Sequence, residues 1–237
     1  KNALLIAVVA VMALAAAAPV RAQTEPAPVR AFRSFSRGSG STGLPASTVV
    51  SLHTDREGPL WIATFDGIAR VEHGAVERLA SAKDAPTSGN MFRIIDRRDG
   101  GIYVSGNKGL YAYDGLRWSL ISTPEEFIGI AENKNRDVVA IDRRAGLWIK
   151  PNTASTWTRI NGTTDGFEPK ALASTSDGLV LVAGVGGVDV LDGNQLRGPL
   201  GAQPSPGRLT TVLVAKNGSV WAGGEDGRLY RFATGAG

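Results

Sequence analysis

Short apolar runs alternate with turns rich in Gly, Asp and Asn along most of the chain. The first four runs cover residues 49–52, 60–64, 68–71 and 75–79, and many of their positions alternate between apolar and polar. Such a period of two is typical of β-strands, and no 3.6-residue helical period is evident after residue 22. The pattern therefore predicts an all-β chain of short strands joined by tight turns.

The same unit of strands and turns recurs five times, at a spacing of about forty residues. A first turn position recurs at residues 58, 100, 136, 178 and 218, and a glycine of the next turn recurs at 67, 109, 146, 187 and 227. The two turns are nine residues apart in four copies and ten apart in the third. Trp61, Tyr103, Val139, Leu181 and Trp221 take equivalent places between them, where we expect them to pack between units.

Four-strand units at this spacing predict a β-propeller, in which each antiparallel sheet is one blade. We place the blades at 43–80, 88–121, 124–160, 166–200 and 207–237. Residues 23–42 form an N-terminal segment, and its strand-like part, 29–35, is a candidate for closing the ring. A β-sandwich is the alternative architecture, but it would not repeat its sequence in this way.

The N-terminus has the pattern of a secretory signal peptide. Lys1 precedes an apolar run, and Val20-Arg21-Ala22 offers a small-residue cleavage site, so we predict a signal peptide over residues 1–22. A membrane anchor is the alternative, although the apolar run is short for a span. Export to the periplasm is the expected localisation.

Charge and composition exclude several classes of protein. The chain has 26 Lys and Arg residues against 22 Asp and Glu, and Lys1 and Arg21 lie in the predicted leader. The remaining basic residues are scattered and form no stripe, which argues against a nucleic-acid partner. The chain has no Cys, which excludes disulfides, thiol nucleophiles and zinc–thiolate sites.

Candidate catalytic chemistry is sparse. His53 ends a first strand and His73 lies in a later turn of the same blade, so we do not expect them to share a metal ion. The glycine-rich stretch 183–189 lacks the spacing of a nucleotide-binding loop, and 132–137 lacks the glycine and distal Glu of a calcium loop. We therefore assign no catalytic residue, metal or cofactor.

Candidate binding residues come from the turns between second and third strands. In a propeller these turns share a rim with the loops that lead into the first strands, and loops on a rigid scaffold often carry binding residues. Adjacent Arg143 and Arg144 suit a carboxylate or sulfate, although solvated turn charges are the simpler interpretation. The candidates on this rim are Phe65, Asp66, Asn107, Lys108, Arg143, Arg144, Glu225 and Asp226.

The first repeat resembles the two-component regulator propeller repeat. The resemblance rests on Gly43-Leu44-Pro45, on Asp55-x-x-Gly58 followed by Leu60-Trp61, and on Asp66-Gly67-Ile68. The second and fifth copies keep the turns and the second strand. The third and fourth are degraded: Arg136 replaces the turn glycine, and Val139 and Leu181 replace the Trp.

The resemblance implies a periplasmic sensor propeller of a bacterial receptor, whose output domain is a histidine kinase or a diguanylate cyclase. Expected partners are a small-molecule or glycan ligand, the rest of the receptor and a second receptor copy. Such propellers have about seven blades, so we expect this chain to be a fragment whose open end blades cause self-association. A stand-alone secreted scaffold is one alternative, and a propeller-fold lyase or hydrolase is another.

Overall fold

The computed structural model describes residues 35–38, 43–55, 58–79, 83–161, 166–200 and 207–232. All of them belong to one of the two compact units of the chain, Phe35–Gly237. The predicted signal peptide, 1–22, lies outside the described residues, as does most of the candidate closing strand 29–35. Within the described part no helix is long and apolar enough to cross a membrane.

Nineteen strands in the described residues form five antiparallel sheets. The first sheet contains β1 (Val49–Thr54), β2 (Leu60–Thr64), β3 (Gly67–Glu72) and β4 (Ala75–Arg78). The second contains β5 (Met91–Asp96), β6 (Ile102–Gly106), β7 (Gly109–Tyr113) and β8 (Trp118–Ile121). The third contains β9 (Phe127–Glu132), β10 (Val138–Asp142), β11 (Leu147–Lys150) and β12 (Thr158–Arg159). The fourth contains β13 (Pro169–Ser174), β14 (Val180–Gly184), β15 (Gly187–Asp192) and β16 (Gln195–Pro199), and the fifth β17 (Leu209–Val214), β18 (Val220–Gly224) and β19 (Leu229–Phe232).

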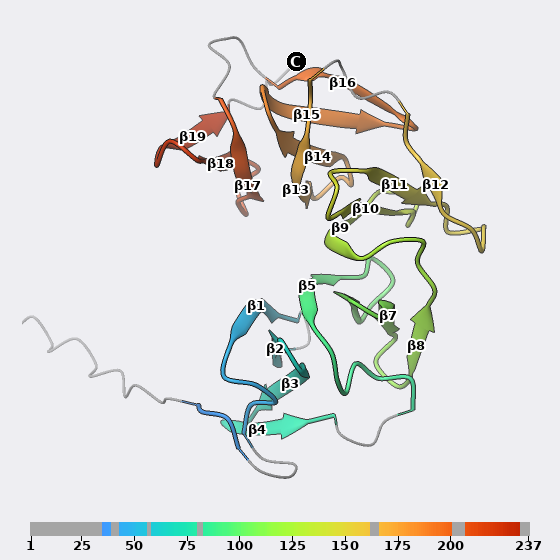
Figure 1. The fold of residues 1–237 in the computed structure, drawn as a ribbon, viewed down its shortest axis with the longest axis vertical. Coiled ribbons are helices and arrows are strands. Elements are labelled where there is room, and N and C mark those ends of the chain that lie inside the picture. Colours follow the sequence, from blue (N-terminus) through green and yellow to red (C-terminus); the bar gives the residue numbers. More distant parts are fainter. Residues whose placement is uncertain are drawn as a thin grey trace, which may run out of the picture. The chain divides into compact units, whose positions relative to one another are not determined.

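The sheets are the blades of a propeller, as the repeat predicts (Figure 1). Strands pair in chain order within each blade. The first strands are innermost and touch in succession, from β1 to β5, β9, β13 and β17. Four blades have four strands, whereas the described part of the fifth has three, which agrees with the weak fourth-strand signal in its sequence.

The recurring Asp-x-x-Gly and Trp of the first repeat form one structural unit. The buried Asp55 carboxylate accepts a hydrogen bond from the Trp61 indole at 3.3 Å, and the Gly58 amide donates to the Asp55 carbonyl at 3.0 Å. Gly58 has a φ of 109°, which a side chain would disfavour. The motif therefore closes the turn between the first two strands and anchors the indole, so its role here is structural.

In the third repeat both turns differ from those of the other copies. Arg136 has a φ of 66°, in the place where the other copies have Gly. In the second turn Leu147 pairs with Ile141 as Ile68 pairs with Ala63, so Gly146 keeps the place of Gly67 and the turn is one residue longer. The extra residue lets Ala145, with a φ of 61°, take the left-handed conformation.

Every first strand also carries a β-bulge at the same place. The register skips one residue where the first strand pairs with the second, at Val50, Phe92, Ile128, Lys170 and Thr210. A bulge bends its strand and redirects the neighbouring side chains. The residues that follow the bulges are Ser51, Arg93, Gly129, Ala171 and Thr211.

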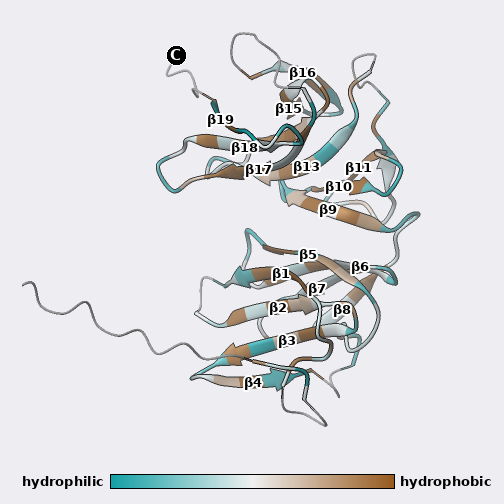
Figure 2. Ribbon diagram, turned by 60° about the vertical axis from the view of Figure 1, so that its left-hand side comes forward, coloured by the Kyte–Doolittle hydropathy of each residue, from teal (hydrophilic) through white to brown (hydrophobic). Residues whose placement is uncertain are grey.

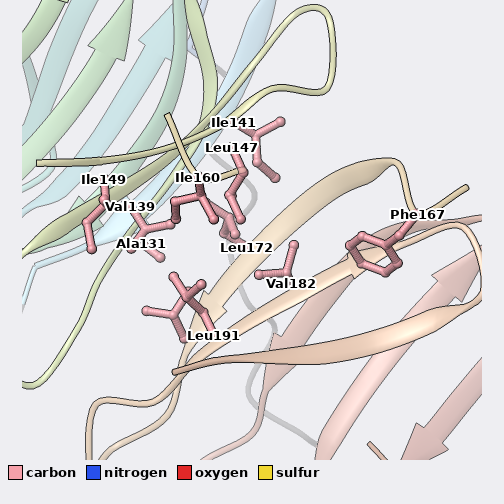
Figure 3. Close-up of a cluster of buried hydrophobic side chains, with 11 residues drawn as sticks. Ala131, Val139, Ile141, Leu147, Ile149, Ile160, Phe167, Leu172, Val182 and Leu191 are labelled. Carbon is pink, nitrogen blue, oxygen red and sulfur yellow. The ribbon is translucent and has the colours of Figure 1, made fainter. Parts of the chain in front are cut away.

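The core lies between blades rather than within any one of them. Apolar residues alternate with polar ones along the strands (Figure 2), and the apolar side chains of neighbouring blades meet. Figure 3 shows such a cluster between the third and fourth blades, where Val139, Ile149 and Leu172 take part. Each large side chain buried there stabilises the fold by about 1.5–3 kcal/mol. Trp61, Tyr103, Val139, Leu181 and Trp221 all hold the second position of a second strand, which confirms the predicted register.

The Gly-Leu-Pro segment packs on the first blade. Leu44 is 5% exposed and contacts Ile62 and Ala69, while the Arg78 guanidinium donates to the carbonyls of Gly43 and Leu44. This segment covers only part of the free face of the first blade. Leu52 on β1 is 62% exposed, whereas its equivalents in the other blades are at most 5% exposed; these are Ile94, Ile130, Leu172 and Val212.

Candidate functional site

The eight candidate binding residues lie in turns between second and third strands, as the repeat predicts. Phe65 and Asp66 join β2 to β3, Asn107 and Lys108 join β6 to β7, and the other pairs occupy the same turn of the third and fifth blades. These turns contact the loops that lead into the first strands. For example, the Gly89 amide donates to the Asp66 carboxylate at 3.3 Å, and the Lys108 ammonium donates to the Ser88 hydroxyl at 2.7 Å.

The charges of this rim are largely paired within the chain. Arg143 forms an ion pair with Glu126 and lies over the Phe92 ring, with its guanidinium carbon 4.8 Å from the ring centroid. Arg144 is 85% exposed and 4.0 Å from Glu125, which makes a weak surface ion pair.

The fifth-blade candidates are paired as well. Glu225 lies 3.6 Å from the Arg208 guanidinium. Asp226 accepts from the Tyr230 hydroxyl at 2.5 Å, and this bond together with the Arg228 amide holds the pKa of Asp226 below its ordinary value. The rim therefore brings the candidate residues to one side of the propeller, with partners already in place for most of them.

A cavity of about 320 Å³ lies at the propeller axis, towards the C-terminal ends of the first strands. The rim with the eight candidates lies at the opposite ends of these strands. Every blade contributes to the wall of the cavity. The lining residues are His53, Arg93, Ile94, Ile95, Asp96, Arg98, Ile130, Ala131, Glu132, Leu172, Ala173, Ser174, Thr175, Ser176, Val212, Leu213 and Val214. None of the eight candidates is among them.

Arg98 connects two blades that are not adjacent. It comes from the turn after β5, in the second blade, and its guanidinium donates to the carbonyls of Thr175 and Ser176 in the fourth blade, both at 3.2 Å from Nη2. The third blade joins through the Lys134 amide, which donates to the Gly178 carbonyl at 2.9 Å. A Cβ on Gly178 would lie 2.4 Å from Arg98 Nη2 and 2.6 Å from the Lys134 amide nitrogen, so this turn requires Gly.

Glu132 is buried at the end of β9, with 3% exposure. Its Oε2 accepts from the Arg98 amide at 2.5 Å, while its Oε1 is buried and has no hydrogen bond in the described structure. Burial raises the pKa of Glu132, and the hydrogen bond from Arg98 opposes this only in part. The Ser174 hydroxyl donates to the Glu132 carbonyl at 2.8 Å, which ties the third blade to the fourth.

His53 and Asp96 form the second polar group of the cavity, with His53 Nε2 2.8 Å from Asp96 Oδ1. His73, by contrast, lies in the turn between β3 and β4 and does not line the cavity. The two histidines thus occupy different parts of the first blade. In the described residues no three His, Cys, Asp or Glu side chains gather in a way that could hold a metal ion.

Arg93 differs from every other charged group in the cavity, because no described residue forms a hydrogen bond, ion pair or ring contact with its side chain. It follows the bulge of β5 and is open to the cavity. Burial lowers the pKa of Arg93, and no carboxylate opposes this shift. The residue as a whole is nonetheless exposed, so solvent reaches its guanidinium, and an anion that entered the cavity could pair with it without displacing an existing partner.

The sequence did carry a signal for Arg93. The residues that follow the bulge in the other blades are small or neutral, namely Ser51, Gly129, Ala171 and Thr211. Aligning the first strands therefore singles out Arg93, whereas an alignment of the turns draws attention to Arg143 and Arg144 instead.

Comparison with known proteins supports the repeat assignment. The family model of the two component regulator propeller matches residues 43–66, which carry the Gly-Leu-Pro and Asp-x-x-Gly elements. No curated protein is similar enough in sequence to be recognised as a relative.

Solved propellers share the fold at low sequence identity. The extracellular domain of the one component system BT4673 from B. thetaiotaomicron superposes with a TM-score of 0.62 at 14% identity, over 80% of this chain and 28% of that one. A gluconolactonase from Xanthomonas campestris gives 0.58 at 15% identity, over 77% and 71% of the two chains. Virginiamycin B lyase from Staphylococcus aureus gives 0.57 at 10% identity, over 79% and 70%.

The chain thus spans less than a third of the BT4673 extracellular domain, whose fold it resembles. At these identities the superpositions establish the fold alone. The chain is a β-propeller, and residues 43–66 carry a two component regulator propeller repeat.

Proposed function

We propose that this chain is the ligand-sensing propeller of a bacterial signalling receptor and that it acts outside the cytoplasm. The regulator propeller repeat at residues 43–66 and the fold shared with the BT4673 extracellular domain support this function. The pattern of a signal peptide over residues 1–22 supports export to the periplasm. A histidine kinase or diguanylate cyclase output, and a second receptor copy as partner, complete the proposal.

The observation that carries the proposal is the axial cavity. Its volume of about 320 Å³ falls at the lower end of the range for small-molecule sites. Side chains from five blades line the cavity. At its wall Arg98 links the second blade to the fourth. A ligand there would contact several blades together and favour one arrangement of them, which is how binding can shift a receptor between states.

The neighbours that are enzymes define the competing function. A gluconolactonase and a streptogramin-type lyase share the fold, so binding must be separated from turnover. Thermal unfolding of the purified chain, residues 23–237, should be screened against sugars, sugar acids and small organic acids. Mass spectrometry of the same mixtures then detects any conversion.

The sensor function predicts that at least one compound raises the melting temperature and is recovered unchanged. Because a ligand that binds only the folded state at a hundred times its Kd stabilises by about 2.7 kcal/mol, the shift is measurable. Recovery of a ring-opened or cleaved product would support an enzyme instead. Absence of any stabilising compound would favour a scaffold.

A further inference from the structure

We infer that the ligand of the axial cavity is a small monocarboxylate whose carboxylate pairs with Arg93. This inference rests on the proposed sensing function and specifies the chemistry of the same site. It starts from the isolation of the Arg93 guanidinium. The other arginines near the cavity have partners: Arg97 pairs with Asp99 at 3.0 Å, and Arg98 donates to two carbonyls.

The surroundings of Arg93 leave space for an anion. The residues at the equivalent place in the other blades carry no charge and do not line the cavity; they are Ser51, Gly129, Ala171 and Thr211. The guanidinium of Arg93 thus faces the cavity with its hydrogen-bond donors available in the described structure. Since a guanidinium binds a carboxylate through two parallel hydrogen bonds, a carboxylate is the best-matched acceptor.

The other charges of the cavity limit the ligand to one carboxylate. Asp96 and Glu132 both line it, and a second negative group near either would be repelled. Ile94, Leu172 and Val212 supply apolar wall, so the rest of the ligand can be partly apolar. A cavity of about 320 Å³ accepts a compound about the size of a monosaccharide or smaller.

The test uses matched pairs of compounds on the purified chain, residues 23–237. Sodium acetate, lactate, gluconate and benzoate are compared with their neutral amides by thermal unfolding and by calorimetric titration. We expect at least one carboxylate to bind and its amide to bind at least tenfold more weakly.

Three variants then locate the site. Arg93→Gln should weaken carboxylate binding at least tenfold, and Arg93→Lys should restore part of it, because the charge returns without the paired geometry. Arg144→Gln makes the same change of charge on the opposite rim and should leave binding unchanged. Since Arg93 has no partner in the described residues, ligand-free Arg93→Gln should melt no lower than the wild type.

The remaining outcomes separate the two proposals. Equal carboxylate binding by wild type and Arg93→Gln would overturn the assignment of Arg93. Loss of carboxylate binding in Arg144→Gln alone would place the binding site on the rim. Binding of neutral compounds to wild type and Arg93→Gln alike would refute the ligand class but leave the sensing function standing. If no compound of either kind bound to the wild type, both proposals would fail.

Discussion

In each of two turns of the third blade a residue other than glycine takes the left-handed conformation. Arg136 and Ala145 have φ values of 66° and 61°, a left-handed conformation that disfavours a side chain by about 1–2 kcal/mol. Asp142 supports the second of these turns. Its buried carboxylate accepts from the amides of Arg144 and Gly146 and from the Trp148 indole, at 2.7, 2.8 and 2.8 Å. In the third repeat a buried carboxylate thus organises the turn in which Ala145 is left-handed.

Replacing Ala145 by Gly should stabilise the protein by up to about 1 kcal/mol, because relief of the left-handed strain outweighs the greater freedom of Gly in the unfolded chain. Urea unfolding measures the change. Ala154, in another turn of the same blade, has no positive φ. Ala154→Gly should therefore destabilise by roughly 0.5–1 kcal/mol. A loss of stability with Ala145→Gly would contradict this account of the turn.

Asp142→Ala should destabilise by roughly 2–4 kcal/mol, since it leaves buried donors without an acceptor. Asp142→Asn keeps one acceptor oxygen and should lose less. Denaturant unfolding of both variants tests this. Equal effects of Ala and Asn would mean that the carboxylate acts through its charge rather than through these hydrogen bonds.

Strand β15 carries a buried carboxyl group, that of Asp189, whose charged form is disfavoured by burial. Asp189 is 3% exposed and pairs with Val182 across the sheet. Burial raises the pKa of Asp189, so the folded protein holds its proton to a higher pH than the unfolded chain does. Folding stability attributable to this group is therefore greatest at acid pH and falls as pH rises through the raised pKa.

Asp189→Asn should consequently raise the melting temperature at pH 7.5, by about 2–4 °C if the gain is near 1 kcal/mol. The difference from wild type should shrink as pH falls towards the ordinary range of Asp, where both proteins carry a neutral group. Melting curves across that range measure it. An advantage of the variant that grew at acid pH would show that the sign is wrong.

The elements that the sequence predicts well are those with a local signal. Turn glycines mark the blade register because other residues reach a left-handed backbone only at a cost. Trp61, which is buried, and Trp221, which is half-buried, mark the same place in two second strands. The bulges beside Val50 and Phe92 have no such marker, since the residues there share no property. The axial cavity escaped prediction because its wall comes from the ends of five first strands that share no motif, and Arg93 is the one residue following a bulge that lines it in the described structure.

For the whole molecule, the two end blades have faces that differ from the inner interfaces. Leu52 on β1 and Leu213 on β17 are both 62% exposed, and Leu229 on β19 is 69% exposed. At the four inner interfaces apolar residues are covered by the next blade. Exposed sheet faces of this kind promote association.

We therefore expect purified residues 23–237 to self-associate, and Leu52→Glu combined with Leu213→Glu to reduce this by adding charge to both faces. Leu116 is 90% exposed in a turn of the second blade, so Leu116→Glu is the matched control and should change nothing. Sedimentation velocity at several concentrations reports the species. A wild-type chain that stays monomeric with a sharp cooperative melt would refute the expectation of open end faces.

The central claim is that the axial cavity, and not the rim, receives the ligand. The most direct measurement is a crystal structure of the chain with the compound that stabilises it most. Our account predicts electron density at the axis, with a carboxylate on Arg93 and the remainder against Leu172 and Val212. Density at Arg143 and Arg144, with an empty axis, would contradict it.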